Sequence, residues 1–264
     1  MAFTASTPLP FAIVNRHGER LDVAYHPVEG AAAEPGASQV PSAIVVIGHG
    51  VTSNKDRPWL VALSEALAAA GIASLRVTFS GNGESEGRYQ DATPSKEAGD
   101  LVSVIDALQQ WGVSRIGYAG HSMGGAVGVL CAAEDSRIRV LVSLAGMFHV
   151  EAFMQRQFGH LAPGDLMLDK PGCPWNTALA EDAARLGSLT TQAGRIAVPW
   201  LLVHGDADEL VPIADADDAC RATGARAELV VLPGVDHRFT GATPAMTSAV
   251  VTWLHGLAGQ PPIE

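Results

Sequence analysis

Short apolar runs alternate with amphipathic segments along most of this chain, and this alternation restricts the possible folds more than any other feature. Strand-like runs lie at Ser42–Ile47, Ile72–Phe79, Arg115–Gly120, Arg139–Leu144, Pro199–His204 and Glu228–Leu232. Helical patterns lie at Trp59–Ala70, Ser95–Trp111, Ser122–Glu134, Ala214–Thr223 and Thr243–Leu257. Such alternation predicts βαβ units, and so an α/β fold with a mostly parallel central sheet and helices on both faces.

Three segments depart from this rhythm. Phe11–Arg16 and Arg20–His26 read as a hairpin, which would add antiparallel strands at one edge of the sheet. Gly30–Pro41 is rich in Ala, Gly, Pro and Ser and is expected to be a surface loop. Met147–Arg195 contains no clear strand. Because an insertion after a strand of an open α/β sheet lies over the ligand crevice, we expect a single domain over residues 1–264 with a small cap at about 147–195.

Composition narrows the class of protein and of partner. The chain has 264 residues, is 47% hydrophobic and carries a formal net charge of −11. A chain of this length can bury one large core. An acidic surface repels phosphates of nucleic acids and anionic lipid head groups, so we expect neither nucleic acid nor membrane as a partner. No oligomeric state is indicated.

Cysteine and histidine usage argues against a disulfide framework and against a metal site. Cys131, Cys173 and Cys220 are scattered, and no Cys-x-x-Cys pair or His/Asp/Glu cluster has metal-ligand spacing. We therefore expect no metal and no cofactor. The first ten residues lack basic residues and a long apolar run, and no stretch approaches 18 apolar residues. These features favour a soluble, cytoplasmic protein.

Ser122 is the candidate nucleophile. It lies in Gly120-His121-Ser122-Met123-Gly124, between a predicted strand and a predicted helix. A serine at such a sharp turn projects its hydroxyl above the sheet, and the flanking glycines allow neighbouring backbone to pass closely. The alternative is an incidental turn sequence, which the strand-turn-helix setting disfavours.

A serine hydroxyl is a weak nucleophile and needs a base, for which His237 is the candidate. It follows the last predicted strand. His49 and His204 are each interpreted as loop packing, and His121 is expected to point away from the nucleophile. The order Ser, Asp, His along the chain fits the choice of His237.

The orienting carboxylate is sought in His204-Gly205-Asp206-Ala207-Asp208. Asp208 lies further along the loop, nearer to the expected position of His237. Asp206 is better placed to accept hydrogen bonds from N–H groups of the turn. We therefore prefer Asp208 and keep Asp206 as the alternative.

Acyl transfer also requires hydrogen-bond donors for the developing oxyanion. The N–H of Met123, directly after the nucleophile, is one candidate. The N–H of Val51 is the other, since Gly50 leaves room beside it, and Thr52 offers a hydroxyl. The alternative is that this loop only turns the chain. The glycine-rich loop Gly81–Gly87 lacks the Lys-Ser/Thr of a phosphate cradle and is interpreted as structural.

These motifs together resemble the α/β-hydrolase superfamily. Gly120–Gly125, Gly205-x-x-Asp208 and Gly234-x-x-His237 carry this resemblance, over roughly residues 11–257. The runs beginning at His49 and Phe79 are similar to small bacterial and plant cinnamoyl and feruloyl esterases. The resemblance implies Ser122, Asp208 and His237 as catalytic residues and Val51 and Met123 as oxyanion donors. Related esterases often have Phe at the position of Val51, so the pocket entrance is expected to differ.

The function expected from these features is hydrolysis of small-molecule carboxylic esters, with small to medium or aromatic acyl groups. Aromatic residues of the cap would favour such groups, although they could equally serve only to pack the cap. A thioesterase, amidase or peptidase with the same triad is an alternative within hydrolases. A non-catalytic ligand-binding scaffold is an alternative of another class.

Overall fold

Seven strands form one sheet in the computed structural model, which describes residues 6–28, 40–224 and 226–258. The strands are β1 (Asp22–His26), β2 (Ala43–Gly48), β3 (Ala73–Thr78), β4 (Arg115–His121), β5 (Ile138–Leu144), β6 (Trp200–Gly205) and β7 (Ala227–Leu232). They are hydrogen-bonded in the order β1-β3-β2-β4-β5-β6-β7. Only β1 runs antiparallel to its neighbour, β3. The expected α/β fold with a mostly parallel sheet is confirmed. The loop Gly30–Pro41 falls almost wholly outside the described residues.

The N-terminal hairpin is present in a reduced form. Its first arm is not a regular strand, because only one bridge, Val14 with Arg20, joins it to the second arm. The Asn15 side chain accepts hydrogen bonds from the N–H groups of His17 and Glu19. Such local bonds compete with strand pairing, which accounts for the short ladder. The second arm continues into β1 and forms the edge of the sheet.

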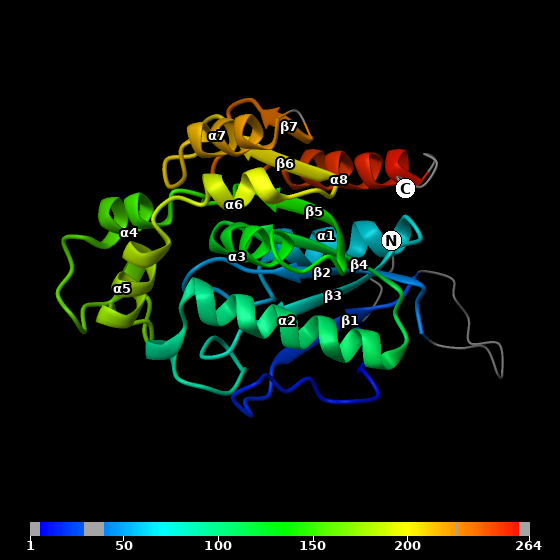
Figure 1. Ribbon diagram of the computed structural model, residues 1–264, viewed down its shortest axis with the longest axis horizontal. Coiled ribbons are helices and arrows are strands. Elements are labelled where there is room, and N and C mark those ends of the chain that lie inside the picture. The colour runs from blue at the N-terminus through cyan, green and yellow to red at the C-terminus, as the bar shows by residue number, and fades with distance from the viewer. Residues whose placement is uncertain (1–5, 29–39, 225, 259–264) are drawn as a thin grey trace.

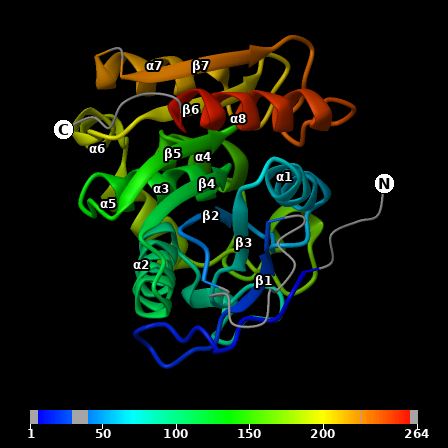
Figure 2. The same cartoon turned by 90° about the vertical axis from the view of Figure 1, so that its right-hand side faces the viewer.

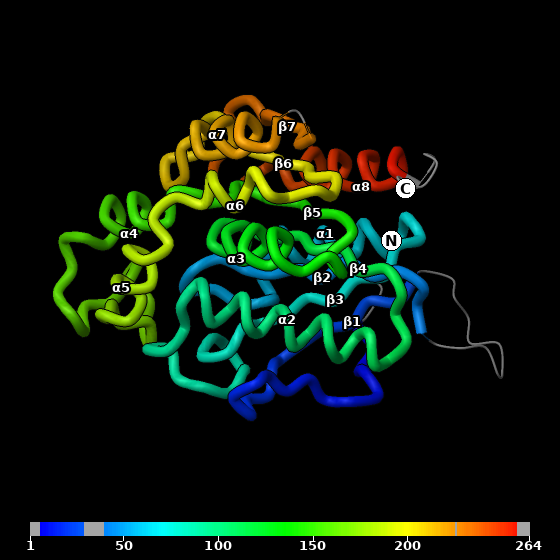
Figure 3. Tube along the Cα trace, viewed as in Figure 1, coloured from blue at the N-terminus to red at the C-terminus, as the bar shows by residue number. Residues whose placement is uncertain are grey.

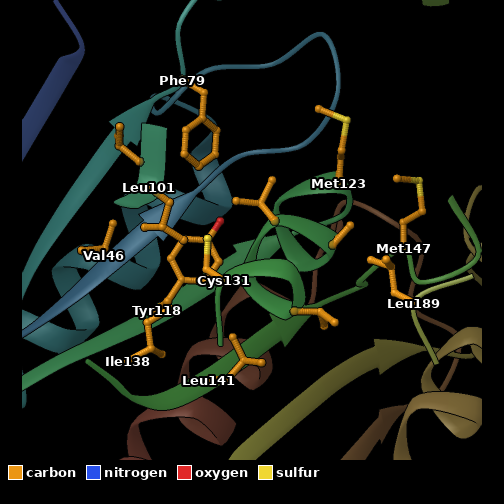
Figure 4. Packing of buried hydrophobic residues seen from close by; sticks show 14 of the residues in the cluster. Val46, Phe79, Leu101, Tyr118, Met123, Cys131, Ile138, Leu141, Met147 and Leu189 are labelled. Atoms are coloured by element: carbon orange, nitrogen blue, oxygen red, sulfur yellow. The ribbon is translucent and has the colours of Figure 1, made fainter. Parts of the chain in front are cut away.

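Helices cover both faces of the sheet (Figures 1 and 2). They are α1 (Pro58–Ala69), α2 (Pro94–Trp111), α3 (Met123–Ala132), α7 (Ile213–Thr223) and α8 (Thr243–Ala258), with a short 3-10 turn η1 at Tyr89–Asp91. The apolar side chains of α1 and α8 form one core with the sheet, and those of α2, α3 and α7 form a second core on the opposite face. Figure 4 shows Tyr118 of β4 beside Cys131 of α3 in this second core.

The segment between β5 and β6 contains the remaining helices. They are α4 (Val150–Phe158), α5 (Thr177–Leu186) and α6 (Thr190–Arg195), with a 3-10 turn η2 at Met167–Asp169. Figure 3 follows this segment from β5 out through α4 and α5, which project beyond the body of the molecule, and back through α6 beside α7. None of the helices in the described ranges has the length and apolarity needed to cross a membrane.

Candidate active site

The residues singled out in the sequence follow the carboxyl ends of four parallel strands. Val51 follows β2, Ser122 follows β4, Asp208 follows β6 and His237 follows β7. Because these strands are parallel, their carboxyl ends lie at one edge of the sheet, which is where ligands bind in open α/β sheets. Val51, Ser122 and His237 line one pocket at this edge.

Ser122 occupies a strained and firmly anchored position between β4 and α3. Its φ is 55°, in a region that non-glycine residues rarely adopt. The Ser122 N–H donates to the Leu144 carbonyl at 2.9 Å, and the Ser122 carbonyl accepts from the N–H groups of Gly125 and Met147 at 2.8 and 3.1 Å. Backbone strain of this kind persists only where the surroundings fix it, and it is concentrated at functional sites.

Close backbone packing explains the two glycines that flank Ser122. A Cβ atom on Gly120 would lie 2.1 Å from the carbonyl oxygen of Gly124. A Cβ atom on Gly124 would lie 2.6 Å from the carbonyl oxygen of His49. Neither backbone atom can move away without disturbing α3 or the loop after β2. Glycine is therefore required at both positions by the turn itself.

The structure brings His237 and Asp208 together. The Nδ1 atom of His237 lies 2.8 Å from Oδ2 of Asp208, and the Asp208 side chain is fully buried. A carboxylate can only accept here, so Nδ1 carries the proton and Nε2 of the neutral ring is left as an acceptor. Asp206 instead accepts the N–H of Gly234 at 2.6 Å and is exposed.

Asp208 is held as a carboxylate by three hydrogen bonds and by the nearby ring of His204. Its Oδ1 accepts the N–H groups of Leu210 and Val211 at 2.9 Å, and its Oδ2 lies 2.8 Å from His237 Nδ1. His204 Nε2 donates to the Val211 carbonyl at 2.9 Å and also lies 3.3 Å from Oδ2. Burial by itself would raise the pKa of Asp208, but the hydrogen bonds from His204 and His237 outweigh it and hold this pKa well below its usual range. His204, expected only to pack a loop, therefore takes part in the site.

The two expected oxyanion donors also have free N–H groups. Among the described residues, neither Val51 nor Met123 donates its backbone N–H to another group. Buried His49 fixes the direction of the Val51 N–H. The Nε2 atom of His49 accepts the Phe79 N–H at 3.0 Å, so its Nδ1 carries the proton and donates to the Gly50 carbonyl at 2.8 Å. The N–H of a trans peptide points opposite to its carbonyl, so anchoring the Gly50 carbonyl orients the Val51 N–H.

The position of His121 differs from expectation. It is expected from the sequence to point away from the nucleophile, but it lines the pocket together with Ser122, and its ring lies beside that of His237, with centroids 4.8 Å apart. Its Nε2 lies 2.9 Å from the His237 carbonyl oxygen. The ring packs on Trp59 and Phe239, with centroids at 5.1 and 6.2 Å. Sequence reasoning missed it because alternation along a strand says nothing about a residue at the strand's last position, where the chain turns.

The pocket is small and mixed in character. It encloses about 190 Å³. Its apolar wall includes Trp59, Phe153, Phe158, Leu168 and Leu210, and its charged residues are Arg57, Lys170 and Arg238. Phe153 and Phe158 also pack against each other within the segment after β5, with centroids 6.0 Å apart. The described residues include no group of three or more His, Cys, Asp or Glu side chains suited to hold a metal ion.

Comparison with known proteins identifies the family of this chain. The sequence pattern of the family described as serine aminopeptidase, S33, matches residues 39–170, half of the chain. An uncharacterized 31.7 kDa protein from the traX-finO intergenic region of Escherichia coli is 29% identical over 103 residues. That match covers 38% of this chain and only 36% of the relative.

Solved structures resemble nearly the whole chain. Est1E from Butyrivibrio proteoclasticus, solved with ferulic acid bound, has a TM-score of 0.81 at 24% identity, and the match covers 95% of this chain and 100% of Est1E. The Pyrococcus furiosus esterase Pf2001 has a TM-score of 0.71 at 21% identity, with 93% and 90% of the two chains covered. At these identities the likeness establishes the fold. Taken with the family match, it shows that this chain belongs to the serine aminopeptidase S33 family of α/β-hydrolase-fold serine hydrolases.

Proposed function

We propose that this protein hydrolyses carboxylic esters of small molecules through an acyl-enzyme formed on Ser122. The observation that carries the proposal is the 2.8 Å contact between His237 Nδ1 and Asp208 Oδ2, in a pocket that Ser122 and His237 both line. This contact leaves His237 Nε2 free to act as the base. The names of the structural neighbours, an esterase and a ferulic acid complex, support an ester as the substrate.

The reaction follows from the atoms available. Ser122 Oγ attacks the ester carbonyl carbon while His237 Nε2 takes its proton, and the N–H groups of Val51 and Met123 donate to the oxyanion. The intermediate collapses, the C–O bond to the alcohol breaks, and His237 returns the proton to the leaving oxygen. Water then attacks the acyl group by the same steps. Asp208 keeps the His237 ring oriented and stabilises its protonated form.

Pocket size supports a small to medium acyl group. A volume of about 190 Å³ lies below the range of about 300–1,000 Å³ typical of drug-sized ligands. The aromatic side chains of Trp59, Phe153 and Phe158 would pack against an aliphatic or aromatic acyl chain. We propose that residues 147–195 act as a cap on a single domain, because Phe153, Phe158 and Lys170 of this segment line the pocket.

Aminopeptidase activity is a second candidate, favoured by the family description. An aminopeptidase has to bind the free α-ammonium group of a peptide, which calls for carboxylates near the nucleophile. The residues that line this pocket include three cations, Arg57, Lys170 and Arg238, and no Asp or Glu. This charge pattern disfavours an ammonium group and supports the ester proposal.

Labelling with a fluorophosphonate probe tests the nucleophile. We expect stoichiometric labelling of the folded protein at Ser122, none in Ser122→Ala, and loss of turnover in that variant. A panel of esters, thioesters and aminoacyl anilides then ranks the substrate classes. Absence of labelling would overturn the hydrolase proposal, whereas labelling with faster turnover of anilides than of esters would favour a peptidase. The cytoplasmic location expected from the sequence stays a prediction.

A further inference from the structure

Two cationic side chains meet at the wall of the pocket that contains Ser122. Arg57 Nη2 and Lys170 Nζ both donate to the backbone carbonyl of Thr52, at 3.4 and 2.6 Å. Arg57 belongs to the loop before α1, and Lys170 belongs to the segment after β5. Like charges that share one acceptor repel each other, so this arrangement is unfavourable without an anion nearby. We refer to Arg57 and Lys170 as the cation pair.

No carboxylate neutralises the cation pair within the described ranges. The ion pairs found there at 4.0 Å or less include neither Arg57 nor Lys170. Burial, followed by the positive charges of Arg57 and Arg238, lowers the pKa of Lys170. The chain as a whole has 28 acidic and 17 basic residues, so cations gathered without acidic partners run against its composition.

A second hollow adjoins the pocket at the cation pair. It encloses about 460 Å³ and shares Thr52, Ser53, Arg57 and Lys170 with the pocket of Ser122. The rest of its wall is polar or small, and includes Asn54, Asn82 and Tyr89 but no Asp or Glu. The cation pair therefore stands on the boundary between the space beside Ser122 and a polar space large enough for a further part of a substrate.

Two buried polar atoms, on residues that line the pocket of Ser122, lack partners among the described residues. Thr52 is only 5% exposed, and its Oγ1 has no hydrogen-bond partner among the described residues. Within the same described ranges, the Nε1–H of Trp59, which lines the pocket, has no partner either. Thr52 also has a φ of 53°, unusual for a β-branched residue. Unsatisfied buried groups are rare in folded proteins and are expected where a ligand supplies the missing bond.

We propose that the ester cleaved at Ser122 carries a carboxylate, and that Arg57 and Lys170 bind this carboxylate. The inference rests on the proposed ester hydrolase function and names its substrate class. A guanidinium and an ammonium offer several charge-assisted donors to one carboxylate, which would relieve their mutual repulsion. The carboxylate binds and orients the substrate and takes no part in bond making or breaking.

Matched pairs of esters test the proposal. Methyl hydrogen succinate is compared with methyl succinamate for a charge on the acyl side, and O-acetyl-lactate with O-acetyl-lactamide for a charge on the alcohol side. In at least one pair, we expect kcat/KM to be about tenfold or more higher for the carboxylate, a difference of ~1.4 kcal/mol in transition-state binding. Added salt should reduce this ratio, because dissolved ions screen charges that remain partly accessible to solvent. The pair that shows the preference identifies which half of the substrate is charged.

Substitution of the cation pair tests whether Arg57 and Lys170 cause the preference for the carboxylate ester. Arg57→Gln and Lys170→Gln should each bring the carboxylate-to-amide ratio close to one, and the ratio corrects for any general loss of activity. Arg115→Gln removes an exposed cation at the amino end of β4, outside both hollows, and should keep the wild-type ratio. In case a variant folds poorly, calorimetric binding of methyl hydrogen succinate to Ser122→Ala, with and without Arg57→Gln, measures the same contact without turnover.

The outcomes separate the two proposals. Equal kcat/KM within both ester pairs, or a preference that survives both Gln substitutions, would overturn the carboxylate inference while leaving fluorophosphonate labelling and neutral ester turnover intact. Failure of labelling and of all ester turnover would overturn the ester hydrolase proposal, and the inference with it. A preference lost in the Arg57 and Lys170 variants and kept in Arg115→Gln supports both.

Discussion

The Nε2 atom of His121 lies 2.9 Å from the backbone carbonyl oxygen of His237, so the residue before the nucleophile holds the loop of the base. A carbonyl oxygen only accepts, so Nε2 is the protonated nitrogen of the His121 ring. Burial, and then the nearby His237, lower the pKa of His121 to about 3, which keeps the ring neutral at physiological pH. The neutral ring of His121 thus holds the backbone of the residue that carries the base.

The first prediction concerns this contact. His121→Ala removes both the hydrogen bond to His237 and the ring that packs on Trp59, so the base should lose its fixed position. We expect kcat on a neutral ester to fall by about 10- to 100-fold with a smaller change in KM. His121→Gln keeps a side-chain N–H at a similar reach and should recover part of kcat. Unchanged kcat in His121→Ala would show that the contact has no positioning role.

The second prediction separates the two neighbouring aspartates. Asp208→Asn removes the charge that orients His237 and stabilises its protonated form, and should lower kcat by about 10²- to 10⁴-fold. Asp206→Asn is the matched control, because the exposed Asp206 only accepts the Gly234 N–H and an amide oxygen can do the same. Measuring kcat of both variants on the same ester shows which aspartate orients His237. A large loss in Asp206→Asn alone would reverse the assignment.

The third prediction concerns the glycine before the nucleophile. In Gly120→Ala the new Cβ would meet the Gly124 carbonyl oxygen at 2.1 Å, so we expect a loss of about 3 kcal/mol in the free energy of unfolding. Gly256→Ala is the control, since its Cβ meets nothing within 4 Å in the exposed part of α8, and it should stabilise the protein by about 0.5–1 kcal/mol. Urea denaturation measures both. Equal stability of the two variants would contradict the close packing.

The fourth prediction concerns pH and Glu97, which is fully buried with Oε2 lacking a partner among the described residues. Burial, and then the negative charge of Asp100, raise the pKa of Glu97 well above its usual 4.5. The folded state therefore keeps a proton that the unfolded state releases above about pH 4.5. Each pH unit in that window costs up to ~1.4 kcal/mol of stability, and the loss ends at the folded pKa.

Glu97→Gln removes this titration. Its free energy of unfolding should fall less between about pH 5 and about pH 8 than that of the wild type, as measured by urea denaturation at each pH. Glu181→Gln, on the exposed side of α5, should follow the wild-type curve. Parallel curves for Glu97→Gln and the wild type would mean that Glu97 is already ionised in the folded protein.

Much of the fold could be predicted from local pattern, because strands buried on both faces read as continuous apolar runs. β2 and β4 agree with their predicted ranges to within a residue or so at each end. The first arm of the hairpin was less predictable. Its apolar run looks like a strand, but the Asn15 side chain takes over the hydrogen bonds of the turn, and such competition is not visible in hydrophobic periodicity.

The candidate site was predictable where a motif fixes its own geometry, as at Ser122. It was less so where contacts join distant segments. Lys170 donates to the Thr52 carbonyl although the two residues are 118 positions apart in the chain. No local sequence pattern predicts that contact. His204 lies in β6 and Asp208 in the loop that follows it, so the two could be paired only once the turn between them was known.

The approach of Gly205 to Val235 bears on how the base and its partner stay together. A Cβ on Gly205 would lie 2.0 Å from the Val235 carbonyl oxygen, and that oxygen accepts the Ala207 N–H at 3.2 Å. The loop after β6, which carries Asp208, and the loop after β7, which carries His237, are thus in direct backbone contact. Their spacing is a mechanical property of the chain, independent of the charge on either side chain. Deprotonation of His237 or substitution of Asp208 should therefore change the chemistry of this pair but not the distance between the two loops that carry it.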